Sequence, residues 1–196
     1  MARPRTFDPD RVLDEAVEVF SEAGFDGTSV PALVERLGIC RQSLYAEFGD
    51  KRGLYLRAVE RYGTSQMDAK IRLLQAEGPP LDHLKTVLRG HASIATGCPG
   101  NGCLAARAIM EIQNDPEALA IVDAQVERFE AAVRDNLARA QAAGTVRADA
   151  RPARLARTIV TTIYGMGVLS RLPGSGPRVA DAVATLLDLV ASVEVR

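Results

Sequence analysis

Arg41, Gln42 and Ser43 stand together at the start of a short predicted helix, and their side chains could recognise DNA bases. An arginine guanidinium can donate two hydrogen bonds to guanine, and a glutamine amide can pair with adenine. Each such pair discriminates against a wrong base by about 1–3 kcal/mol. Leu44 and Phe48, four residues apart on the same predicted helix, would face inward and anchor it. This pattern predicts a base-reading helix.

Two short helices are needed to position these side chains, over residues 30–37 and 41–48. The residues between them are Gly38-Ile39-Cys40, and this spacing is typical of a helix-turn-helix. Such a turn needs a residue that tolerates positive φ, and Gly38 supplies it. The spacing by itself also fits an ordinary three-helix bundle.

Further side chains could hold the phosphate backbone. Thr28, Ser29 and Lys51 lie at predicted helix N-termini, where free amides and the helix dipole favour an anion. The phenol of Tyr45, one step along the recognition helix, suits a phosphate or a thymine methyl group.

The overall charge does not indicate a nucleic-acid partner. The net charge is −1, and residues 1–62 contain nine Lys and Arg against eleven Asp and Glu. DNA binding must therefore depend on where the charges lie. Arg3 and Arg5 are on an N-terminal arm that could reach the DNA backbone or minor groove, or could simply be solvated.

The rest of the chain also reads as helices. Aromatic residues make up 5% of the sequence and Trp is absent, while apolar residues recur at steps of three and four. Gly78-Pro79-Pro80 is the clearest break. We expect later helices over residues 81–96, 103–112, 116–143, 155–169 and 178–193. No apolar run is long enough to cross a membrane, and no signal-peptide core is visible, so we expect a cytoplasmic protein.

No pattern indicates an enzyme, a cofactor or a metal site. The chain contains no Gly-x-Ser-x-Gly, Gly-Lys-Ser/Thr or His-Glu-x-x-His motif. Cys40 is either a reactive thiol at a helix N-terminus or a plain substitution. Cys98 and Cys103 could form a disulfide or stay reduced, and two thiols without a nearby histidine are too few ligands for a metal.

Four polar residues in the second half stand among apolar neighbours and are candidates for binding a small molecule. They are His91, Arg107, Glu111 and Tyr164. Each could instead be an ordinary surface, core or interface residue.

Residues 16–59 resemble the TetR family of bacterial transcriptional regulators, and the resemblance covers residues 8–62 at the level of motifs. The matching pieces are Phe20, Gly24-Phe25, Thr28-Ser29-Val30, Leu37-Gly38-Ile39, Ser43-Leu44-Tyr45, Phe48, Lys51 and Leu54. The chain departs from the family pattern at Cys40, where Ser or Thr is common, and at Ala46-Glu47. The Glu47 carboxylate would point sideways or accept from a cytosine amine.

The resemblance implies an all-α protein with two domains. Residues 1–62 would form a three-helix DNA-binding domain, and residues 63–196 a larger helical domain that binds an effector and forms a homodimer. By position, the phosphate contacts would be Thr28, Ser29, Tyr45 and Lys51. The base contacts would be Arg41, Gln42 and Ser43.

The expected mechanism is repression through a dimer. Helices 155–169 and 178–193 would pair across a two-fold axis and hold two recognition helices about 34–36 Å apart, on one face of a near-palindromic operator. A small-molecule effector would favour a different spacing and release the DNA. The alternative is a helical ligand-binding or interaction protein without operator binding, which the acidic first domain and Glu47 favour. The effector, the operator and the sign of regulation stay open.

Overall fold

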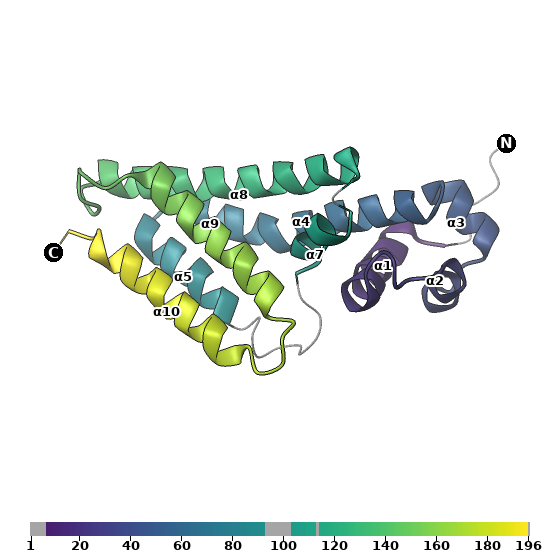
Figure 1. Ribbon diagram of the computed structural model, residues 1–196. Helices are drawn as coiled ribbons and strands as arrows, with labels where there is room; N and C mark the ends of the chain where they lie inside the picture. The colour runs from purple at the N-terminus through teal and green to yellow at the C-terminus, as the bar shows by residue number, and fades with distance from the viewer. Residues whose placement is uncertain (1–6, 93–102, 113, 196) are drawn as a thin grey trace. The chain divides into compact units, whose positions relative to one another are not determined.

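The computed structural model describes residues 7–92, 103–112 and 114–195 (Figure 1). Within these ranges the chain forms nine α-helices, which confirms the all-α prediction. An isolated antiparallel bridge joins Val146 to Glu194. Arg3, Arg5 and Cys98 lie outside the described residues.

The chain divides into two compact units, each built from two stretches of sequence. The first unit contains residues 1–65 and 103–122, and the second contains residues 66–102 and 123–196. The sequence led us to expect one boundary, at residue 62. In the structure, residues 103–122 pack with the N-terminal residues instead.

The first unit contains the predicted DNA-reading helices. They are α1 (Pro9–Ala23), α2 (Val30–Leu37) and α3 (Arg41–Phe48), followed by the first part of α4 (Lys51–Gln75), α7 (Leu104–Glu111) and the start of α8 (Pro116–Ala142). The bounds of α2 and α3 match the prediction.

The helix ends in this unit follow from local chemistry. The Asp8 carboxylate accepts from the Asp10 amide at 3.0 Å, and Asp50 accepts from the Gly53 amide at 2.7 Å, which caps the N-termini of α1 and α4. Gly24 ends α1 with φ 77°, and Gly38 ends α2 with φ 64° and ψ 28°. Both values lie where glycine is favoured.

The core of the first unit centres on Tyr55 of α4, which is fully buried. The rings of Phe20 and Phe25 meet it edge-on at centroid distances of 4.8 and 5.0 Å. Burial raises the pKa of the Tyr55 hydroxyl. These rings join α1 and the turn after it to α4.

The second unit is a bundle around one apolar cluster. Its helices are the rest of α4 and α8, α5 (Pro80–Ala92), α9 (Pro152–Leu169) and α10 (Gly176–Ser192), and all five contribute to the cluster. Helices α5 and α10 pack side by side (Figure 1). The end of α4 is capped from α8, because Asn136 donates to the Leu74 carbonyl at 2.9 Å and Arg139 donates to the Ala76 carbonyl at 3.1 Å.

Gly38 gives a direct test of the turn before α3. A Cβ at this position would meet no atom within 4 Å, so only the backbone conformation requires glycine. We expect Gly38→Ala to lower the free energy of unfolding by about 1–2 kcal/mol. Gly38→Asn should lower the free energy of unfolding by less than Gly38→Ala does, because asparagine adopts the left-handed conformation more readily than alanine. Urea unfolding followed by circular dichroism measures both.

The matched control is Gly90→Ala, at an exposed position of α5, where φ is not positive and a Cβ would also meet open space. This change should raise stability by about 0.5–1 kcal/mol through helix propensity. If Gly38→Ala stabilised the protein as Gly90→Ala does, the left-handed turn would not be needed.

Candidate functional site

The N-terminal end of α3 presents its polar side chains to solvent. Arg41 and Gln42 are exposed and Ser43 is partly buried, while Leu44 is 0% and Phe48 6% exposed. The two apolar residues bury one face of the helix, so Arg41 and Gln42 lie on the other. The predicted anchors are confirmed.

Arg41 and Tyr45 form a pair on the exposed face of α3. The Arg41 Nε donates to the Tyr45 hydroxyl at 3.0 Å, and the guanidinium carbon lies 5.3 Å from the centre of the tyrosine ring. One turn of helix separates the two residues, so their side chains can meet. The pair holds the guanidinium on the outside of α3 before any ligand arrives, and its remaining N–H groups are available.

Cys40 precedes α3 without capping it by its side chain, as the poor capping ability of a thiol predicts. Its Sγ lies 3.2 Å from the Ser43 Oγ, and this hydrogen bond lowers the pKa of the exposed thiol. Ser43 therefore has a partner inside the protein as well as a place at the base-reading end of the helix.

Thr28 and Ser29 are adjacent but their hydroxyl groups are differently placed. Thr28 is 3% exposed and donates to the Gly24 carbonyl at 2.5 Å. Ser29 is exposed, and its Oγ accepts from the Ala32 amide at 3.3 Å as the cap of α2. Only Ser29 therefore presents its hydroxyl at the surface, in contrast to the expected pair of phosphate contacts.

The Lys51 side chain folds onto the turn between α1 and α2. Its Nζ donates to the Phe25 carbonyl at 2.9 Å and to the Thr28 carbonyl at 3.0 Å, and lies 4.1 Å from the centre of the Phe25 ring. An ammonium group has three donors, so one is left for a phosphate. Lys51 primarily holds the turn.

Most of the acidic side chains around α3 and α4 are paired with arginines. Glu47 lies within 3.3 Å of Arg57 and is 13% exposed, so its carboxylate points sideways, the first of the two expected orientations. Arg61 pairs with Asp10 and Asp14, and Arg52 pairs with Asp115 and Glu117. The Arg52 guanidinium lowers the pKa of Asp115 to about 2. Arg41 forms no ion pair within the described part of the chain.

This pairing was missed at the sequence level. Arg52 and Asp115 are 63 residues apart, so no helical spacing connects them. Glu47 and the neighbouring carboxylates are neutralised by arginines close to them. The excess of acidic residues within residues 1–62 therefore gives little support to the alternative that the protein does not bind an operator.

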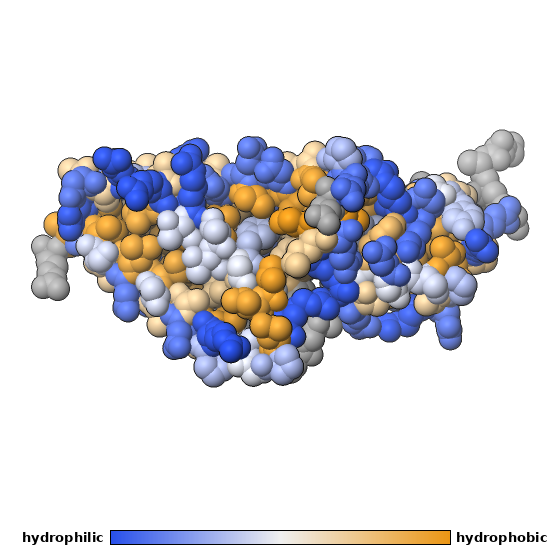
Figure 2. Space-filling model, viewed as in Figure 1, coloured by the Kyte–Doolittle hydropathy of each residue, from blue (hydrophilic) through white to orange (hydrophobic). Residues whose placement is uncertain are grey.

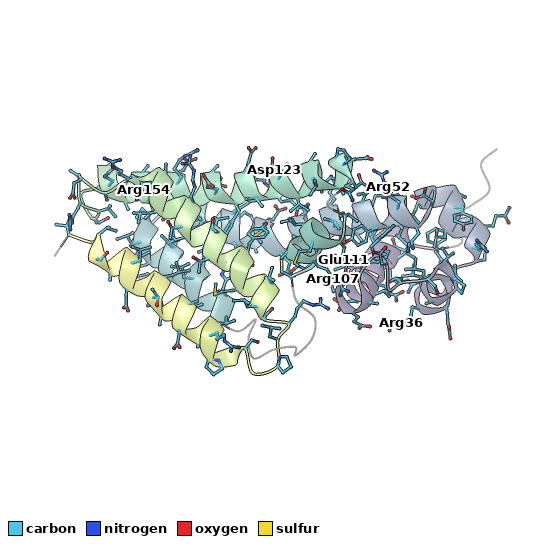
Figure 3. The ribbon with its side chains drawn as sticks, in the orientation of Figure 1. Arg36, Arg52, Arg107, Glu111, Asp123 and Arg154 are labelled. Atoms are coloured by element: carbon cyan, nitrogen blue, oxygen red, sulfur yellow. The ribbon has the colours of Figure 1, made fainter. Side chains whose placement is uncertain are left out.

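Arg107 and Glu111, two of the candidate effector residues, belong to the first unit. Arg107 donates to the carbonyls of Ser21, Glu22 and Ala23 at the end of α1. Glu111 accepts from Arg107 and from the Phe25 amide, the latter at 2.7 Å. Figure 3 shows the two side chains on α7, next to α1. Their polar groups are occupied within the protein.

His91 and Tyr164, the other two candidates, belong to the second unit. His91 is 2% exposed; its Nδ1 lies 2.8 Å from the Val87 carbonyl, and its buried Nε2 has no hydrogen-bond partner among the described residues. Burial and the charge of Lys70 lower the pKa of His91 to about 4. Tyr164 packs, partly buried, against the apolar cluster of this unit.

The comparisons with known proteins cover both units. Residues 12–58 match the family model described as bacterial regulatory proteins, tetR family, and residues 80–186 match the model of a tetracyclin repressor-like C-terminal domain. Among the described helices, none is long and apolar enough to span a bilayer.

Two curated relatives and one solved structure are similar over most of the chain. The HTH-type transcriptional regulator YezE of Bacillus subtilis is 31% identical over 193 residues, which are 97% of this chain and 100% of YezE. The HTH-type transcriptional repressor BdcR of Escherichia coli is 33% identical over 140 residues, covering 70% of this chain and 69% of BdcR.

The solved structure is the TetR family transcriptional regulator CifR, in a cysteine-substituted form bound to 26-base-pair double-strand operator DNA. It is 26% identical, with a TM-score of 0.80, and the match covers 95% of this chain and 98% of CifR. Together with the exposed polar end of α3, these matches show that the chain belongs to the TetR family of bacterial regulatory proteins and is a DNA-binding transcriptional regulator, not an enzyme.

Proposed function

We propose that this regulator is a cytoplasmic repressor that binds a near-palindromic operator as a homodimer and is released by a small-molecule effector. The observation that carries the proposal is the pair of exposed side chains, Arg41 and Gln42, at the N-terminal end of an α3 anchored by buried residues. Operator binding by CifR and the repressor name of BdcR support the same mechanism.

In this proposal the residues of the first unit divide into two groups. Arg41, Gln42 and Ser43 read bases, and Ser29, Tyr45 and Lys51 contact phosphates, Lys51 through its third donor. Thr28 has its hydroxyl bound to Gly24 and acts by holding the turn. Arg3 and Arg5 would add contacts from the N-terminal arm.

Arg41→Ala tests base reading. We expect affinity for the specific site, sought in the DNA flanking the protein's own coding region, to fall by about 1–3 kcal/mol while affinity for random DNA falls less. Gel shift and fluorescence anisotropy on both DNAs measure the difference. Arg36→Ala is the control, because it removes the same charge from α2, where Arg36 pairs with Glu22. Equal losses on both DNAs would show that Arg41 contacts only the backbone.

The dimer in this proposal forms through α9 and α10. Apolar side chains are exposed at the end of α9 and in the turn after it, where Val168 is 37%, Leu169 43% and Leu172 51% exposed (Figure 2). Gly165 on the same helix is also exposed, with open space at its Cβ position. A second copy would cover this apolar surface and could approach closely at the glycine.

Leu169→Glu should therefore shift the protein from dimer to monomer, because it buries a charge in the proposed interface. Sedimentation velocity over a concentration series measures the shift. Met110→Glu is the matched control: Met110 is 64% exposed on α7, outside the proposed interface, and its change should leave the dimer intact. A Leu169→Glu protein with an unchanged sedimentation coefficient would contradict this interface.

The effector subsite in this proposal contains His91 and Tyr164 of the second unit. The Val87 carbonyl can only accept, so the Nδ1 of His91 carries the proton and its buried Nε2 is an acceptor. An effector at this subsite would supply a hydrogen-bond donor such as a hydroxyl group. Arg107 and Glu111 are not part of it, because α1 and the turn after it occupy their polar groups.

The buried His91 also predicts a pH dependence of stability. Its pKa is about 4 in the folded protein and near 6.5 in the unfolded chain, so between these values the unfolded chain binds a proton that the folded protein does not. The free energy of unfolding is therefore not reduced by His91 above pH 6.5, and it decreases as the pH falls from 6.5 toward 4. The free energy of unfolding, measured with urea, should decrease less from pH 7 to pH 5 in His91→Gln than in the wild type. Identical decreases would mean that His91 is not the group responsible.

A further inference from the structure

We propose that α7 is a positioning element of the DNA reader, and that Arg107 and Glu111 act as a clamp on the turn between α1 and α2. The clamp is defined as these two side chains. The inference rests on the proposed operator binding, and it assigns to α7 a role that lies outside the helix-turn-helix itself.

The first half of the clamp is Arg107, which closes the C-terminal end of α1. The last carbonyls of a helix have no partner within the helix, and a cation at this end is favourable. Arg107 Nη1 lies 3.2 Å from the carbonyls of Ser21 and Glu22, and Nη2 lies 2.8 Å from that of Ala23. One planar guanidinium therefore satisfies three consecutive carbonyls.

The second half is Glu111, which binds the next peptide group. Its Oε2 accepts from the Phe25 amide at 2.7 Å, and its Oε1 accepts from the Arg107 Nε. The two side chains are 15% and 21% exposed. Hydrogen bonds to charged groups are stronger than those between neutral groups, and partial burial reduces their screening.

Gly24 shows independently that α7 is fitted to this turn. Its φ of +77° favours glycine, and a Cβ placed on it would collide with the side chains of both Arg107 and Glu111. The backbone conformation therefore disfavours any side chain at Gly24. A side chain there would also force the ends of the Arg107 and Glu111 side chains to move away from their partners.

The same turn is also held from α4. Lys51 binds the carbonyls of Phe25 and Thr28, and the Thr28 hydroxyl binds that of Gly24. The turn leads directly into Ser29, the cap of α2, and α2 supports α3. With the clamp in place the turn is bound from α4 and from α7, so the start of α2 has a defined position. Without it only the α4 side is held.

The experiment compares Arg107→Ala with Arg107→Lys and with a charge-matched control, Arg128→Ala. Arg128 pairs with Asp68 in the second unit, so its removal costs the same charge and one ion pair away from the turn. DNA affinity is measured by anisotropy on DNA flanking the coding region. Hydrogen exchange is measured on peptides covering residues 21–29, α3 and the second unit.

We expect Arg107→Ala to bind DNA about tenfold more weakly and to exchange faster at residues 21–29, with α3 and the second unit unchanged. Lysine at position 107 should restore part of the affinity, because an ammonium can donate to the same carbonyls but lacks the planar fork. Arg128→Ala should behave as the wild type in both measurements.

Two results would overturn the clamp. One is wild-type exchange at residues 21–29 in Arg107→Ala, and the other is an equal rise at residues 21–29 and at α3, which would indicate general destabilisation of the first unit. If the wild type binds none of the flanking DNA, the proposed operator binding fails on that DNA, and the exchange data still decide whether Arg107 holds the turn.

A double-mutant cycle tests the fit at Gly24. Gly24→Ala should lower the melting temperature in the wild type through both the strained φ and the collision. In a background carrying Arg107→Ala and Glu111→Ala the collision is gone and only the strain is left, so the decrease should be smaller. Equal decreases in the two backgrounds would show that the clamp side chains do not press on Gly24.

Discussion

The orientation of the proposed DNA-recognition helix α3 depends on burying one face of its eight residues. Two turns of helix are too short to be stable in isolation, so α3 takes its orientation from packing. Leu44 and Phe48 provide that packing, and the left-handed residue Gly38 brings the chain into the helix at the required angle. Arg41 and Gln42 are exposed because the anchors occupy the opposite face. The aromatic contacts of Tyr55 with Phe20 and Phe25 keep the unit that holds these anchors together.

Most carboxylates near α3 and α4 of the first unit are neutralised by an arginine next to them. Its acidic groups outnumber its basic groups along residues 1–62, yet arginines on α4 neutralise carboxylates on α1, α3 and α8. Exposed ion pairs of this kind add little stability, but they cancel repulsion that would otherwise act on a phosphate backbone. Arg41, held by Tyr45 and by no carboxylate among the described residues, keeps its charge for a ligand. Position, and not net charge, makes the unit suitable for DNA.

The turn between α1 and α2 is one of the places where the two stretches of the first unit meet. Its peptide groups are bound by Lys51 from α4 and by Arg107 and Glu111 from α7. Each of these side chains carries a charge that, by sequence alone, suggests a ligand. A buried or half-buried peptide group without a partner is costly, and long charged side chains are able to supply one from a distance. The same chemistry that binds phosphates or effectors serves here to order the backbone.

The amino-acid sequence by itself determined the helices, their caps at Asp8, Ser29 and Asp50, and the polar end of α3. These features depend on side-chain periodicity and on backbone preferences within a few residues, which any sequence displays directly. Only the tertiary structure decided that Thr28 turns inward and that α7 belongs with the DNA reader. Thr28 donates to a carbonyl only four residues away, but its burial comes from the packing of the unit. The place of α7 depends on side chains that reach carbonyls and carboxylates more than 60 residues away in the chain. Periodicity holds no information about contacts at that separation.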